Sequence, residues 1–307
     1  MEIVTQVTAL NVKYPGITMA LGTFDGIHLG HQQIISQAVD LARQINGTSV
    51  VFTFSNHPLS IVAPERQPLQ LVTQEDKAEL IAELGVDILL TIPFTPEFLQ
   101  LSATDFIRLL WENLSPKHIV VGPNYYFGYN RSGTPEMLQQ AGKKNGFDVN
   151  IHPIVYLKNT IVSSTLIRKM ISAGKVEQAS FLLGRQFKIK GLVIHGEKRG
   201  RTLGYPTINL EISNQLLLPA NGVYAVTIDI GRIQYNGIAN IGTNPTFNGI
   251  QRHLEAHILD FTGDLYGTTV TVTFLQHIRE QQKFSSADEL KMQIGQDIKA
   301  AKHYYAK

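Results

Sequence analysis

Gly22-Thr23-Phe24-Asp25-Gly26-Ile27-His28-Leu29-Gly30-His31 places two histidines around a glycine where a strand is expected to give way to a helix. Residues 17–21 before it form a short apolar run typical of a buried strand, and apolar residues recur at helical spacing from Ile34 to Ile45 after it. A helix N-terminus offers unpaired N–H groups and positive potential, and glycines let the backbone approach an anion closely. The stretch therefore predicts a phosphate site at a helix entrance.

The two histidines could instead cap the helix, belong to the core, or form half of a metal site. No obvious third ligand follows in metal spacing. The strand, glycine and helix context favours the phosphate site over these alternatives.

Composition limits the class of protein. At 307 residues the chain is long enough for two domains, and the absence of Cys excludes disulfides and thiol catalysis and fits a reducing compartment. The N-terminus lacks a signal-peptide pattern and no apolar run approaches membrane-spanning length, so we expect a soluble, cytoplasmic protein. A net charge of +2 with mixed signs favours small anionic ligands over nucleic acid.

The first half of the chain alternates strand-like and helix-like segments. Strands are expected at 49–54, 87–94 and 118–122, and helices are expected to begin at Thr73, Ser102 and Thr134. Repeated βα units of this length predict a parallel sheet with right-handed crossovers and ligands at the carboxyl ends of its strands. The histidine loop lies at such an end.

The second half changes to a period of two. Strand candidates are 187–195, 206–212, 222–230, 233–242, 253–261 and 269–279, followed by a helix that Ser286 would cap, with an apolar stripe at Leu290, Ile294, Ile298 and Ala301. This pattern predicts an antiparallel barrel with a terminal helix across one face. Short helices are expected at 164–171 and 176–183, so we expect one domain at 1–182 and a second at 183–307.

Further polar residues follow the expected strands of the first half. Hydroxyls at Ser163, Ser164 and Thr165, with Arg168 in the first turn of a helix, could hold phosphate oxygens, although such a run alone is usually an N-cap. His57 lies in a Pro-containing turn, which could equally be structural. The 121–128 loop carries Asn124 and aromatic side chains that could stack on a flat ring.

The segment 191–209 is rich in glycine and basic residues and lacks the spacing of a Walker P-loop. A solvated hairpin turn is the ordinary interpretation. It leads into Thr207 and Asn209, which point to one face at a period of two and could hold a hard cation carrying nucleotide phosphates. Glu255 lies on the opposite face of its strand from Leu254, where spacing alone would favour an exposed carboxylate.

These motifs, in this order over nearly the whole chain, resemble those of the bacterial bifunctional riboflavin kinase/FAD synthetases. The resemblance implies an N-terminal α/β Rossmann-like nucleotidylyltransferase domain that adenylylates FMN and a C-terminal riboflavin kinase barrel. In the first domain it assigns catalysis to His28, His31 and Arg168, ATP binding to Gly22, Phe24, Asp25, Gly30, Ser163, Ser164 and Thr165, and flavin binding to His57, Asn124 and Tyr126. The family often has Asp at the position of Asn124.

For the kinase, the resemblance implies that Glu255 accepts the proton of the 5′-hydroxyl of riboflavin and that Arg279 contacts flavin. It assigns ATP binding to Gly196, Lys198, Gly200, Arg201 and Thr202, and metal binding to Thr207 and Asn209. The family has mostly Ala at the position of Ile208 and often an acid at that of Gln281. Mg²⁺ is the implied metal, and ATP, riboflavin, FMN and FAD are the implied ligands, with no nucleic-acid or membrane partner.

Three alternatives remain open at this point. The first is a transferase with the same histidine motif and another acceptor, against which the kinase-like second half argues. The second is a flavin-binding regulator with one or both sites inactive. The third is an oligonucleotide-binding barrel, suggested by the basic cluster at 198–201, which lacks interleaved aromatics.

Overall fold

The structure is a computed structural model that describes residues 1–307 apart from 8–9, 197–199, 201–202, 247–248 and 306–307. The chain divides into two compact units, Met1–Ser163 and Ser164–Lys307. Each unit has its own sheet and core. No described helix has both the length and the apolarity needed to cross a bilayer.

The first unit is built on a six-stranded sheet in the order β1-β4-β3-β2-β5-β6, with every neighbouring pair parallel. The strands are β1 (Glu2–Val4), β2 (Thr18–Leu21), β3 (Ser49–Phe54), β4 (Ile88–Ile92), β5 (His118–Val121) and β6 (Asp148–Ile151). The predicted parallel sheet is confirmed. The edge strands β1 and β6 were missed because they are short and partly exposed, and so lack a continuous apolar run.

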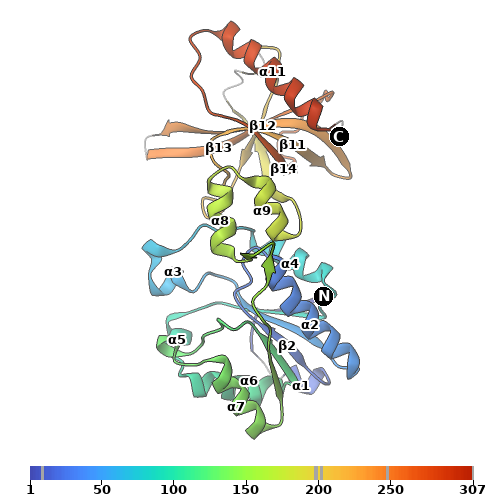
Figure 1. Ribbon diagram of the computed structural model, residues 1–307, viewed down its shortest axis with the longest axis vertical. Coiled ribbons are helices and arrows are strands. Elements are labelled where there is room, and N and C mark those ends of the chain that lie inside the picture. Colours follow the sequence, from blue (N-terminus) through green and yellow to red (C-terminus); the bar gives the residue numbers. More distant parts are fainter. Residues whose placement is uncertain (8–9, 197–199, 201–202, 247–248, 306–307) are drawn as a thin grey trace. The chain divides into compact units, whose positions relative to one another are not determined.

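Helices cover both faces of this sheet (Figure 1). They are α1 (Leu10–Lys13), α2 (Leu29–Gln44), α3 (Leu59–Val62), α4 (Gln74–Glu83), α5 (Pro96–Leu99), α6 (Ala103–Leu114) and α7 (Pro135–Asn145), with 3-10 turns η1 (Pro64–Arg66) and η2 (Tyr129–Arg131) and a hairpin of β7 (Tyr156–Leu157) and β8 (Thr160–Ile161). Thr73, Ser102 and Thr134 each accept a backbone N–H at a helix start, which confirms the predicted caps.

Alternate residues of β2 face the two cores. Met19 and Leu21 belong to a cluster with Phe106 of α6, whereas Ala20 belongs to a cluster with Ile35 of α2. All five are nearly inaccessible to solvent. A strand buried on both faces has no polar side, which is why residues 17–21 read as a continuous apolar run.

The strand order reverses next to β2, because β3 and β4 lie on one side of it and β5 and β6 on the other. In open α/β sheets this switch point leaves a crevice outside the carboxyl ends of the strands, where ligands bind. The loops that follow β2 and β5 begin at this crevice. The topology thus brings the histidine loop and the 122–128 loop to one edge of the sheet.

The second unit is a closed barrel in the order β10-β13-β12-β11-β14-β9, all antiparallel, which confirms the predicted barrel. Its elements are α8 (Ser164–Ser172), α9 (Val176–Leu183), β9 (Phe187–Ile194), β10 (Ile208–Glu211), β11 (Gly222–Ile230), β12 (Ile233–Thr246), β13 (Gly249–Ile258), β14 (Thr269–Glu280) and α11 (Ala287–Tyr305). Burial alternates strictly along β9, as the period of two requires.

The terminal helix α11 lies across one side of the barrel (Figure 1) and contacts β11, β12 and β14. Its Ile294, Ile298 and Ala301 pack with Val223 and Ile238. The Tyr305 hydroxyl accepts the Val226 N–H, and its one proton lies within hydrogen-bond reach of the carbonyls of Val226 and Gly237, which anchors the last turn. The predicted apolar stripe therefore buries a second face of β11.

The helices α8 and α9 group with the barrel by their contacts. The amide of Ala220 donates to the carbonyl of Ile171, and α9 contacts β9 and β14, burying Val176 and Ala179. The structural division therefore comes before α8, whereas the domain boundary expected near residue 183 comes after α9.

Candidate active sites

The loop that carries the histidines is held in an unusual backbone conformation. Phe24 and Ile27 adopt positive φ values of 50° and 38°, and their side chains are each only 1% exposed. Left-handed conformations of bulky residues cost about 1–3 kcal/mol each and persist where the surroundings enforce them. Here burial of both side chains, a hydrogen bond from Gln32 Nε2 to the Ile27 carbonyl and one from the Thr53 hydroxyl to the Thr23 carbonyl enforce them.

His28 is the N-cap of α2, and its Nδ1 accepts the His31 N–H at 3.2 Å. Because Nδ1 is an acceptor, the proton of the neutral imidazole lies on Nε2, which is therefore a donor. The rings of His28 and His31 stack with centroids 3.6 Å apart, and Phe24 meets His31 edge-on. A Cβ on Gly30 would lie 3.2 Å from the His28 ring, so a side chain there would displace it. The cap and a phosphate contact use different nitrogens and are compatible.

A pocket at the carboxyl ends of β2 and β3 is lined by Thr23, Asp25, His57 and Lys77, among others. The Asp25 carboxylate accepts the Leu71 N–H, which ties the histidine loop to the segment before α4. His57 Nδ1 accepts the Leu59 N–H. The structure thus brings an expected ATP-side residue, Asp25, and an expected flavin-side residue, His57, into one pocket.

Sequence reasoning missed Lys77, which is 5% exposed. Its Nζ donates to the Phe54 carbonyl at 3.0 Å and to the Thr53 hydroxyl at 3.4 Å. The sequence did contain a signal for its burial, because Lys77 lies three and four residues before Leu80 and Ile81, on the apolar face of α4. Burial lowers the pKa of Lys77 from 10.5 to about 8, and the Asp25 carboxylate opposes this only in part.

The lowered pKa of Lys77 predicts that the unfolding free energy of the protein depends on pH. The folded chain releases the Lys77 proton near pH 8, whereas the unfolded chain keeps it to about 10.5. Below pH 8 the folded state therefore carries the full free-energy cost of burying the ammonium. This cost decreases as the pH rises from 8 to 10.5. Between pH 7 and 10.5 the parent should gain about 3 kcal/mol of unfolding free energy relative to Lys77→Met. Denaturant unfolding of both proteins across this range measures the difference, and parallel profiles would contradict a buried ammonium.

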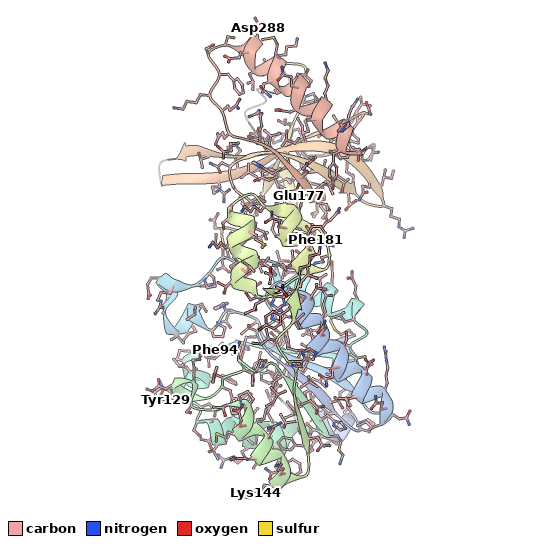
Figure 2. The ribbon with its side chains drawn as sticks, viewed as in Figure 1. Phe94, Tyr129, Lys144, Glu177, Phe181 and Asp288 are labelled. Atoms are coloured by element: carbon pink, nitrogen blue, oxygen red, sulfur yellow. The ribbon has the colours of Figure 1, made fainter. Side chains whose placement is uncertain are left out.

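The remaining residues expected at the flavin lie on the loop after β5. Asn124 is exposed, and Tyr126 is 44% exposed with the guanidinium of Arg131 4.8 Å from its ring centroid. Tyr129, labelled in Figure 2, is also at the surface. The loop therefore presents aromatic rings and a cation to solvent, and their contact with flavin stays a prediction.

The second expected phosphate element spans the division between the units. Ser163 is the last residue of the first unit, Ser164 begins α8, and Arg168 lies one turn further along that helix. Ser163, Ser164 and Arg168 are half-buried, whereas Thr165 is exposed. Their action together with the histidine loop stays a prediction.

The second unit has a cavity of about 380 Å³ between the barrel and α11. Asn209 of β10 and Asn240 of β12 are the register partners of Glu255 in β13, so three polar residues form a row across adjacent strands. Thr207 also lines the cavity. Leu254 and Ala256 point to the opposite, buried face. The expected metal ligands and the expected base thus share one cavity, and Asn240 joins them.

The glycine-rich segment before β10 closely approaches this row. A Cβ on Gly196 would lie 2.1 Å from Asn209 Nδ2, and one on Gly200 would lie 2.4 Å from the Tyr205 carbonyl oxygen. At Gly200 the obstacle is backbone, so only glycine allows this approach, whereas a side chain at Gly196 would displace the Asn209 amide. Lys198, Arg201 and Thr202, which were expected to bind ATP, lie outside the described residues.

Arg279 forms a two-pronged ion pair with Asp297 of α11, with both N···O distances 2.8 Å. The side chains are 15% and 3% exposed, so the pair fixes α11 over the cavity that both residues line. Asp297 was missed, although an acid three residues after Ile294 interrupts the apolar stripe of the predicted helix. The expected contact of Arg279 with flavin stays a prediction.

Two histidines of β13 also line the cavity and were missed. His253 Nε2 lies 3.8 Å from Glu255 Oε1, and His257 Nδ1 donates to the Pro206 carbonyl at 2.7 Å. The second contact fixes the chain just before Thr207. His253, Glu255 and His257 occupy every second position of one expected strand, so the sequence alone could have placed both histidines on the same face as Glu255.

Comparison with known proteins assigns a family to each half of the chain. The FAD synthetase family model matches residues 11–166 and the riboflavin kinase model matches residues 183–305. Over 98% of its length the chain is 38% identical to a Pseudomonas fluorescens protein named bifunctional riboflavin kinase/FMN adenylyltransferase, 97% of which is covered. The chain belongs to this bifunctional family. An Escherichia coli protein of the same name is 37% identical over 94% of this chain and 93% of its own.

The fold of this family member also matches a solved structure. A crystal structure from Streptococcus pneumoniae, titled as a macrolide-efflux protein, aligns with a TM-score of 0.90 and 34% identity over 98% of this chain and 99% of its own. The two family matches leave residues 167–182 between them, which comprise most of α8 and all of α9 except its last residue, Leu183. Membership of the bifunctional family thus covers both the parallel sheet and the barrel.

Proposed function

We propose that this chain phosphorylates riboflavin to FMN with ATP and then adenylylates FMN to FAD, releasing pyrophosphate. The observation that carries the proposal is the match of both family models to the two halves of one chain, with the expected site residues at the loop after β2 and in the barrel cavity. No nucleic-acid or membrane partner is proposed, and we place the activity in the cytoplasm.

In the adenylyltransferase step, a phosphate oxygen of FMN attacks the α-phosphorus of ATP and the bond to pyrophosphate breaks. No protein nucleophile is needed, so the enzyme contributes alignment and donors for the charge that develops on the phosphoryl oxygens. His28 Nε2–H and the N-terminus of α2 supply such donors. His31, stacked on His28, supplies another.

In the kinase step, Glu255 accepts the proton of the 5′-hydroxyl as that oxygen attacks the γ-phosphorus of ATP and ADP leaves. The donor set suits Mg²⁺, because Thr207 and Asn209 offer neutral oxygens and Glu255 a carboxylate in one cavity. Among the described residues no cluster of three His, Cys, Asp or Glu side chains competes as a metal site. Bound Mg²⁺ would neutralise charge on the transferring phosphates, with Thr207 and Asn209 as its protein ligands.

Product analysis tests the proposal directly. The full chain incubated with riboflavin, ATP and Mg²⁺ should yield FMN first and FAD later, as separated by chromatography. FMN alone with ATP should yield FAD and pyrophosphate. Adenylylation of another acceptor in preference to FMN would replace the proposal with the alternative transferase, and flavin binding without turnover would favour a regulator.

A fragment of residues 164–307 should fold and form FMN but no FAD, because the barrel, α8 and α9 form one compact unit. A fragment of residues 183–307 lacks α8 and all of α9 except Leu183, so the contacts of α9 with β9 and β14 are largely lost. We expect it to melt at a lower temperature than the longer fragment. A folded 164–307 fragment without kinase activity would contradict the assignment of that step to the barrel.

A further inference from the structure

The pocket at the carboxyl ends of β2 and β3 presents hydrogen-bond donors. Its lining includes Lys77 and His57. His57 Nδ1 accepts the Leu59 N–H, which places the ring proton on Nε2 and makes that nitrogen a donor. The Lys77 ammonium has three donors, and the hydrogen bonds of its Nζ to Thr53 and Phe54 go to neutral oxygens.

The pocket is also short of negative charge. The Asp25 carboxylate is the anionic group that acts on Lys77, and it accepts the Leu71 N–H with both oxygens. Burial of the ammonium outweighs the attraction of Asp25, since the pKa of Lys77 falls to about 8 despite it. A buried cation without full compensation favours the arrival of an anion.

We propose that Lys77, assisted by His57, binds the phosphate of FMN and so selects FMN over flavins without a phosphate as the acceptor for adenylylation. This inference rests on the proposed adenylyltransferase function. It concerns the acceptor, because the pocket lies beside the histidine loop and contains His57, which belongs to the expected flavin side.

The chemistry is consistent with a binding role. A phosphate has several oxygens, so one can accept hydrogen bonds from Lys77 and His57 while another attacks the α-phosphorus of ATP. The new P–O bond forms as the bond to pyrophosphate breaks, and Lys77 keeps its proton throughout. A point charge on a lysine suits phosphate without demanding a single geometry.

A merely structural role for Lys77 makes a different prediction. The Thr53 hydroxyl bonds both Lys77 Nζ and the Thr23 carbonyl, so it links the ammonium to the histidine loop. If Lys77 acted only through this link, Thr53→Val should damage FAD synthesis as much as Lys77→Met. If Lys77 binds phosphate, Thr53→Val keeps the charge and raises the KM for FMN much less than Lys77→Met does, even where loss of the bond to the Thr23 carbonyl lowers the rate.

The experiment measures FAD synthesis by the full-length parent, Lys77→Met, His57→Asn and Thr53→Val. For each protein, the KM for FMN, the KM for ATP and the inhibition constant of lumiflavin are determined. Lumiflavin carries the ring system but neither phosphate nor a hydroxyl for the kinase. His57→Asn keeps an acceptor for the Leu59 N–H and removes the Nε2 donor. FMN formation from riboflavin reports on the other site.

Lys77→Met should raise the KM for FMN about 10–100-fold, and His57→Asn about 2–10-fold, the scale of losing a charged and a neutral hydrogen bond. The inhibition constant of lumiflavin, the KM for ATP and the rate of FMN formation should all stay within about twofold of the parent's values. In Lys77→Met, a parallel rise of the lumiflavin constant or an unchanged KM for FMN would overturn the inference. An equal rise of the KM for FMN in Thr53→Val would overturn it as well. A parent that makes no FAD from FMN would instead overturn the proposed function.

Discussion

His31→Ala is expected to lower FAD synthesis from supplied FMN about 10²–10³-fold, the usual scale for losing one preorganised donor in a transition state. His28→Ala should lose a similar factor. FMN formation from riboflavin should remain nearly intact in both variants, because Glu255, Thr207 and Asn209 belong to the other unit. Chromatography of both flavin products at saturating substrate measures the two activities in one assay.

The cap formed by His28 calls for a matched control. His28→Ala also removes the side chain that accepts the His31 N–H, which costs about 0.5–2 kcal/mol of stability. His28→Asn keeps a good N-cap but has no donor where Nε2–H lies, so it should restore the melting temperature without restoring FAD synthesis. Full activity in His28→Asn would show that the ring serves only the helix. Equal losses of both activities in a folded variant would contradict two separate sites.

Glu255→Gln should lower FMN formation about 10²–10⁴-fold, since loss of a positioned base typically has that effect. The amide keeps the size of the side chain and its place between Asn209 and Asn240. Thr207→Ala and Asn209→Ala should also abolish most FMN formation, because they remove proposed oxygen ligands of Mg²⁺. FAD formation from supplied FMN should persist in all three variants.

Titration with Mg²⁺ separates the two roles within the cavity. The Thr207 and Asn209 variants should need more Mg²⁺ for half-maximal kinase activity, whereas Glu255→Gln should lower the maximal rate at the parent's Mg²⁺ requirement. Ser286→Ala, at the start of α11, is a suitable control because its side chain caps Glu289 and lies outside the row of polar residues. Kinase activity of Glu255→Gln within about tenfold of the parent would rule out its role as base.

Local signals predicted the elements with the greatest internal regularity. The strand at β3 and the period of two along β9 were found because each pattern repeats over six or more residues. The caps at Thr73 and Ser102 were found because a side chain and an N–H three residues apart meet in any helix start. Such interactions depend on local conformation alone.

The edge strands and the pockets were less accessible to sequence reasoning. β1 has three residues and pairs with β4, more than eighty residues away, so no local pattern marks it. The place of Lys77 among the apolar residues of α4 was visible, but its hydrogen bonds to Thr53 and Phe54 depend on how α4 packs against β3. Asn240 likewise becomes a site residue only through the register of β12 with β13.

The sequence by itself determined the two fold classes, the strand-to-helix turn with its two histidines, and the face shared by Thr207 and Asn209, because backbone periodicity and glycine or cap chemistry act within a few residues. Only the tertiary structure decided that Asp25, His57 and Lys77 line one pocket and that Asp297 clamps Arg279. These contacts join residues distant in the chain. Strand register and core packing set them, and neither has a local period that can be read from the sequence.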